Sequence, residues 1–161
     1  NPDAVRPWQH VLNPLSGYLT LAQSLCDSAE FAEGWNFGPS EQDARPVRFI
    51  LERLRERWPT PFSWQADERP NPSEARFLML DSGKARARLG WSPVWDLEAA
   101  IDKVVQWHDA HRRGADMRRV SIEQIENFMQ HQLPLRSVGH SPPDPAAWVD
   151  PNDSPPEDLS A

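Results

Sequence analysis

Apolar residues recur at helical spacing along most of the first 133 residues, and capping residues or glycines bound each stretch. The first predicted helix begins at Asn13, an N-cap residue followed by proline, and ends near Asp27. Its apolar face consists of Leu15, Tyr18, Ala22 and Leu25. A second helix is predicted from Pro46, with charged residues opposite an apolar stripe formed by Val47, Ile50, Leu51, Leu54 and Trp58.

Two further helices are predicted from a capping aspartate at the start and a glycine at the end of each. Asp81 is placed to cap a short helix over residues 82–89, and Gly90 supplies the left-handed residue that ends it. Asp96 caps a longer helix, which Gly114 ends. The apolar face of the longer helix consists of Leu97, Ile101, Val104 and His108.

The last predicted helix starts at a capping box of Ser121 and Gln124 and continues through Leu133. After it the composition changes, because residues 134–161 hold seven prolines, few aliphatic residues and an acidic excess. So little apolar surface cannot offset the entropy of ordering a chain. We therefore expect one domain over residues 1–133 and a proline-rich disordered tail over residues 134–161.

Extended structure is predicted where short apolar runs lie between glycines or prolines. These runs cover residues 3–12, 34–38, 62–66 and 76–80. The chain should therefore be mostly helical with a few short strands.

Composition excludes several classes of function. A formal net charge of -7 argues against a nucleic-acid partner, which needs a clustered excess of Lys and Arg. No run of about 18 apolar residues exists, so no membrane span is expected. The single Cys26 cannot form an internal disulfide, which favours a cytoplasmic location. The chain begins with Asn1 and not with Met, so we expect it to start within a longer protein.

Common catalytic and metal motifs fail when their spacing is tested. Residues 82–84 (Ser-Gly-Lys) lack the earlier glycine and the following Ser or Thr of a phosphate-binding loop. His108 and His111 are one helical turn apart but have no third ligand near them in the sequence, so no metal site is predicted. Cys26 has no base nearby and is interpreted as a core residue.

Arg6 and Glu74 are candidates for binding. Arg6 lies between Pro2 and Pro7 in an otherwise apolar segment, where its guanidinium could contact a phosphate in two places or form a structural salt bridge. Local chemistry does not decide between the two. Glu74 could accept hydrogen bonds from ribose hydroxyls, although spacing alone favours a solvated residue at the start of the next strand.

Residues 1–18, 33–39, 74–75 and 80–91, taken in order and with their spacing, resemble the second half of the CDP-glucose 4,6-dehydratases. These are NAD-dependent extended short-chain dehydrogenases. The most specific segment is Arg-Pro-Trp-Gln-His-Val at residues 6–11. The resemblance covers about residues 1–133, and it implies an α/β fold of which this chain is the C-terminal substrate-binding portion, with the Rossmann core missing.

The resemblance also implies an activity and a set of binding residues. In that family NAD oxidises the sugar at C4, water is lost across C5 and C6, and the hydride returns to C6. Arg6 is expected to contact the pyrophosphate of CDP-glucose, and Glu74 to lie on the nucleotide side of the pocket. Arg69 is a third candidate, because related dehydratases carry an arginine in this loop. The parent enzyme is expected to be a homo-oligomer.

The chain departs from the family in three respects. Its seven glycines provide no dinucleotide-binding fingerprint, and Tyr18 is not followed four residues later by the Lys of a Tyr-x-x-x-Lys pair. NAD is therefore expected to bind to a missing N-terminal half, with this chain inactive alone. Asn71 and Ser73 stand where the family has histidines, which leaves the nucleobase open. The alternatives are another nucleotide-sugar dehydratase or epimerase, and a non-catalytic helical interaction module.

Overall fold

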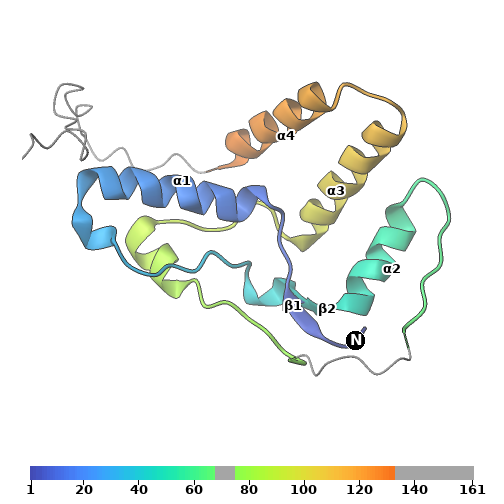
Figure 1. Ribbon diagram of the computed structural model, residues 1–161, viewed down its shortest axis with the longest axis horizontal. Helices are drawn as coiled ribbons and strands as arrows, with labels where there is room; N and C mark the ends of the chain where they lie inside the picture. The colour runs from blue at the N-terminus through green and yellow to red at the C-terminus, as the bar shows by residue number, and fades with distance from the viewer. Residues whose placement is uncertain (68–74, 133–161) are drawn as a thin grey trace, which may run out of the picture.

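The described residues, 1–67 and 75–132 of a computed structural model, are mostly helical and include one two-stranded antiparallel sheet. The helices are α1 (Leu12–Asp27), α2 (Val47–Arg57), α3 (Leu97–Arg112) and α4 (Met117–His131), and the strands are β1 (Val5–Pro7) and β2 (Ala44–Pro46). Short turns follow at η1 (Ala29–Phe31), η2 (Glu41–Asp43) and the π-helical η3 (Ala85–Leu89). Figure 1 shows α3 beside both α2 and α4, with α1 passing the end of α4. The prediction of a mostly helical chain with a few short strands is confirmed for these residues.

Helix α1 begins at Leu12, two residues before the predicted first helical residue Pro14, and Asn13 is not its cap. The N–H of Leu12 donates to Nδ1 of His10 at 3.2 Å, so a histidine side chain accepts a backbone hydrogen bond from the first turn. Asn13 is fully buried, and its side chain contacts the backbone at Val94 and Trp95. The cap prediction was wrong because a distant segment competes for the Asn13 amide.

The sheet joins the beginning of the chain to the segment before α2. Strand β1 pairs antiparallel with β2, with Arg6 opposite Arg45. On its other side β1 forms a single parallel bridge, from Val5 to Phe77. The Val5 N–H donates to the Arg76 carbonyl at 2.8 Å, and the Val5 carbonyl accepts from the Leu78 N–H at 3.2 Å. The predicted strand over residues 76–80 is therefore reduced to one bridge.

The strands predicted at residues 34–38 and 62–66 are not formed. In the first segment Phe37 is buried against Trp91, as expected for an apolar run, but side chains take the place of a neighbouring strand. Gly38 N–H donates to Ser82 Oγ at 2.6 Å, and the Phe37 carbonyl accepts from Gln9 Nε2 at 2.7 Å. Because these bonds satisfy the backbone, burial does not require a ladder.

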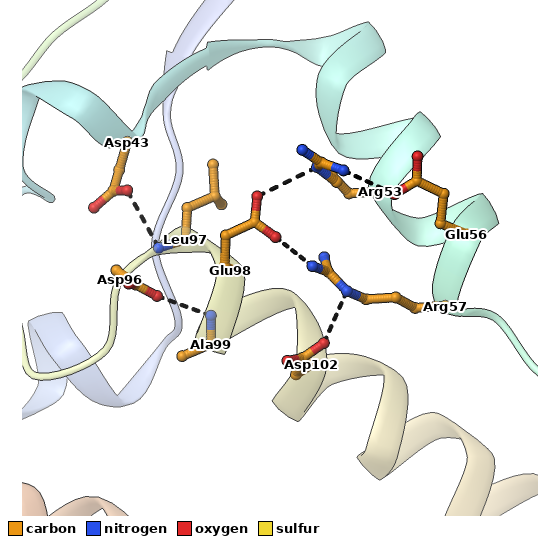
Figure 2. Close-up of polar contacts among 9 residues, drawn as sticks. All are labelled: Asp43, Arg53, Glu56, Arg57, Asp96, Leu97, Glu98, Ala99 and Asp102. Carbon is orange, nitrogen blue, oxygen red and sulfur yellow. Dashed lines mark hydrogen bonds and ion pairs between the residues drawn. The ribbon is translucent and has the colours of Figure 1, made fainter.

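Helix α2, which follows strand β2 directly, packs on α3. Leu97, Ile101 and Val105 are buried on α3 and meet an apolar stripe formed by Phe49, Ile50, Leu54 and Trp58. Figure 2 shows Glu98 between Arg53 and Arg57, while Arg57 Nε reaches Asp102 Oδ1 at 2.9 Å. Ion pairs exposed to this extent add little stability, so the apolar stripe contributes most.

The beginning of α3 is capped as predicted, and by more than one side chain. Asp96 Oδ1 accepts from the Ala99 N–H at 2.9 Å. Buried Asp43 accepts from the Leu97 N–H at 3.3 Å, which joins η2, directly before β2, to the same helix end (Figure 2). The predicted left-handed conformation of Gly90 is confirmed with φ of 65°, and Gly114, predicted to end its helix, has φ of 73°.

Helix α4 begins at Met117 and is capped by Asp116, not by Ser121. The Ser121–Gln124 pair, predicted as a capping box, lies inside the helix and faces α3. Ser121 Oγ accepts from Trp107 Nε1 at 3.1 Å, and Gln124 Nε2 donates to the Lys103 carbonyl at 2.8 Å. The box prediction was wrong because both polar side chains bond across to a neighbouring helix.

Candidate anion-binding site

Arg6 lies at the centre of the small sheet and is half-buried. Its Nη1 donates to the carbonyl of Val5 at 2.7 Å. Strand β1 is bordered by β2 on one side and by the bridge to Phe77 on the other, so Arg6 lies between two segments distant in sequence. A guanidinium fixed in this way keeps a planar set of donors suited to phosphate oxygens.

The other two predicted binding residues, Arg69 and Glu74, lie outside the described residues. The described chain resumes at Ala75, and Arg76 is joined to β1 through the Val5 N–H.

Three of the side chains that follow Arg6 in the most specific segment have structural partners, namely Trp8, Gln9 and His10. Trp8 Nε1 donates to the Arg45 carbonyl at 2.9 Å, and Gln9 Nε2 donates to the Phe37 carbonyl. His10 packs edge-on against Trp95, with ring centroids 4.8 Å apart. These contacts fix the backbone after Arg6 to three separate parts of the molecule. Residues 6–11 therefore also hold the local backbone in place, a role that the sequence alone did not reveal.

His10 is buried, and its environment favours the neutral ring. Burial lowers the pKa of the His10 imidazole, and the charge of Lys103 lowers that pKa further. A neutral His10 is required to accept the Leu12 N–H through Nδ1. The residue therefore acts as a positioning group for α1.

A cavity of about 260 Å³ lies between the start of α1 and the helices α3 and α4. Its lining residues are His10, Val11, Leu12, Val104, Trp107, His108, Ser121, Gln124 and Ile125. The lining is mainly apolar and includes no carboxylate or arginine, so it does not suit a diphosphate.

The described residues offer no acid–base pair of the expected type. Tyr18 is exposed on α1 and meets Phe37 edge-on at 5.5 Å, with Ala22 one turn further along. Within residues 1–67 and 75–132, no three His, Cys, Asp or Glu residues gather as a metal site. In the same part of the chain, no helix is both long and apolar enough to cross a membrane.

The helix starts do not fit the pyrophosphate of NAD. Asp96 and Asp43 occupy the start of α3, and Asp116 occupies the start of α4, where carboxylates would repel a phosphate. Helix α2 follows Pro46 directly, and α1 starts beside His10. No described helix opens from a glycine-rich turn. The described helix starts are therefore not suited to hold the pyrophosphate of NAD.

Comparison with known proteins places this geometry in context. No protein-family model matches the chain. The chain is 46% identical over 130 residues, or 80% of its length, to the CDP-glucose 4,6-dehydratase of Salmonella typhimurium. This chain is related to the nucleotide-sugar dehydratases and epimerases. The resemblance to the CDP-glucose 4,6-dehydratases is thereby confirmed.

A second relative is more distant. The UDP-glucose 4-epimerase of Rhizobium meliloti is 26% identical over 110 residues, which are 68% of this chain. The chain spans about a third of either relative, namely 36% of the dehydratase and 32% of the epimerase. The roles of Arg6, Arg69 and Glu74 stay predictions.

Proposed function

We propose that this chain forms the nucleotide-sugar-binding part of a CDP-glucose 4,6-dehydratase. The reaction converts CDP-D-glucose to CDP-4-keto-6-deoxy-D-glucose, with NAD bound by residues outside this chain. The observation that carries the proposal is the 46% identity over 130 residues to a protein of that name. The parent enzyme is proposed to be a homo-oligomer.

Within this function the chain binds and orients the substrate. Arg6 contacts the diphosphate through its guanidinium, and its fixed position in β1 reduces the entropy lost on binding. Glu74 and Arg69 contribute on the nucleotide side of the pocket. Proton transfer and hydride transfer are assigned to residues outside this chain, since Tyr18 lacks the lysine partner.

A second candidate is the same role in another nucleotide-sugar dehydratase or epimerase. The similarity to a UDP-glucose 4-epimerase favours it, as do Asn71 and Ser73 in place of the family histidines. The two candidates differ in nucleobase, so binding of different sugar nucleotides separates them.

The test is a titration of isotopically labelled chain with CDP-glucose, UDP-glucose and dTDP-glucose, followed by amide NMR. We expect the smallest dissociation constant for CDP-glucose. Arg6→Gln should raise it about tenfold, because one charge-assisted contact is lost. Arg55→Gln is the matched control, since Arg55 is exposed on α2 and forms no ion pair among the described residues.

The same preparation tests the assignment of catalysis. Chain mixed with NAD and CDP-glucose should yield no 4-keto product by mass spectrometry. Product formation would contradict the assignment of catalysis to other residues. Absence of binding by all three sugar nucleotides would contradict the proposed function.

A further inference from the structure

The first turn of α1 depends on His10, a residue type that titrates near neutral pH. Its ring is buried and meets the Trp95 ring edge-on, with centroids 4.8 Å apart. Nδ1 of His10 accepts from the Leu12 N–H at 3.2 Å, and the His10 carbonyl accepts from the Asn13 N–H at 3.0 Å. His10 thus satisfies two backbone donors at the start of α1, and its ring does so only while Nδ1 carries no proton.

The same turn borders the cavity described above. Residues 10–12 line this space of about 260 Å³ together with residues of α3 and α4. Val11, in the middle of that segment, is 60% exposed. A turn beside a cavity makes fewer apolar contacts than one in a packed core, so the hydrogen bonds of His10 carry more of the cost of opening it.

The charges around His10 favour its neutral form. Burial lowers the pKa of the His10 imidazole below its ordinary value of 6.5, and the charge of Lys103 on α3 lowers that pKa further. The Lys103 ammonium is held over the Trp95 ring, 5.3 Å from its centroid. His108, also on α3, lines the same cavity, and the residues that α4 contributes to the lining are uncharged. Asp96, which follows Trp95, caps α3.

We propose that His10 is a pH-sensitive switch, in which protonation of the ring releases the first turn of α1 and opens the adjacent cavity to water. A protonated Nδ1 cannot accept from the Leu12 N–H, so two donors then face each other. The new charge is also buried and is repelled by Lys103. The rest of α1 stays in place, because the Asn13 side chain is bonded to the backbone before α3. The switch involves no ligand and is independent of the proposed function.

The experiment follows the full chain by NMR from about pH 8 to about pH 5. The shift of the His10 Cε1–H gives the midpoint of protonation, which should lie below 6.5. The protection factor of the Leu12 amide corrects for the pH dependence of exchange itself, and it should fall about tenfold with the same midpoint. The protection factor of the Ala99 amide, bonded to Asp96 at the start of α3, should not change.

Substitutions separate the charge of the ring from a structural role. His10→Asn supplies an acceptor for the N–H two residues later and does not titrate in this range, so Leu12 protection should become independent of pH. Lys103→Gln removes the neighbouring charge and should raise the His10 midpoint toward 6.5. Arg55→Gln, the matched loss of charge on α2, should leave that midpoint unchanged. His108→Gln should keep the loss of Leu12 protection at low pH.

Leu12 protection that stays constant while His10 becomes protonated overturns the proposal, as does an equal loss at low pH in His10→Asn. If His108→Gln abolishes the loss, the titrating group is His108 and the proposal fails. A His10 midpoint at or above 6.5 contradicts it as well. If His10→Asn does not fold, Lys103→Gln provides the test, because the midpoint of Leu12 protection should then move upward together with that of His10.

Discussion

Asn13 shows how one side chain can join distant parts of this chain. Its Oδ1 accepts from the Val94 N–H at 3.0 Å and from the Trp95 N–H at 3.2 Å, while its Nδ2 donates to the Trp95 carbonyl at 2.8 Å. The Asn13 carbonyl also lies 3.3 Å from Trp91 Nε1. The side chain has no exposed surface, so water cannot replace these bonds.

We predict that Asn13→Ala lowers the free energy of unfolding by about 3 kcal/mol, because it leaves buried backbone groups without partners. Gln23→Ala, at an exposed position of the same helix, should change it by less than about 0.5 kcal/mol. Urea unfolding followed by tryptophan fluorescence measures both. Equal urea midpoints of unfolding for the two variants would show that the hydrogen bonds of the Asn13 side chain are not needed for stability.

Among the helices, α1 does not bury the face that its amphipathic sequence pattern predicts to be buried. The predicted apolar face is largely exposed, with Leu15 42% and Tyr18 56% accessible. The residues that α1 buries are small or polar, namely Asn13, Ser16, Gly17 and Thr20. Small side chains allow the helix to approach the 34–39 segment closely. The hydrophobic pattern therefore predicted the helix correctly, but it predicted the wrong face of the helix to be buried in this chain.

Gly17 tests that close approach. A Cβ at this position would lie 2.3 Å from Cδ1 of the buried Phe37 ring. Gly17→Ala gains about 1 kcal/mol of helix propensity, but overpacking costs about 3 kcal/mol at its upper range. We predict a net loss of about 2 kcal/mol in the free energy of unfolding.

The matched control for this prediction is Gly34→Ala, because nothing lies within 4 Å of a Cβ there. It should be neutral or slightly stabilising. Thermal unfolding by circular dichroism compares the two variants. If Gly17→Ala is as stable as Gly34→Ala, then α1 does not pack on Phe37 as described.

Among the described residues, 1–67 and 75–132, apolar side chains form two small cores and also remain exposed on helix faces. One core surrounds Phe37 and Trp91, and the other lies between α2 and α3. Exposed apolar residues at α1 and its N-cap are Val11, Leu15, Tyr18, Leu19 and Leu25, and those on α4 are Ile122, Ile125 and Met129. Contiguous apolar surface on this scale favours association.

We predict that the purified chain self-associates through α1. Leu19 is 69% exposed, so Leu19→Glu should reduce association with little loss of stability. Gln23→Glu, also exposed on α1, adds the same charge and keeps the apolar surface. Light scattering after size-exclusion chromatography should show smaller particles for Leu19→Glu than for Gln23→Glu. A monomeric parent chain would contradict the prediction.

The sequence by itself determined the features that depend on neighbouring residues. It predicted the second helix from Pro46, which is the residue before its first residue Val47, the cap at Asp96 and the glycines at 90 and 114 that end helices. Each depends on backbone conformation within one or two turns, which local side chains control. The family resemblance, led by residues 6–11, was also visible without coordinates and is confirmed by the 46% identity.

Tertiary structure decided which groups share a site and which face of a helix is inside. Arg45 carries no local signal, and it stands opposite Arg6 only because β1 pairs with a segment far along the chain. Asn13 and Ser121 were assigned to caps because their local pattern fits one, yet distant partners bind them instead. Hydrogen bonds between residues remote in sequence do not depend on sequence spacing, so pattern alone could not locate them.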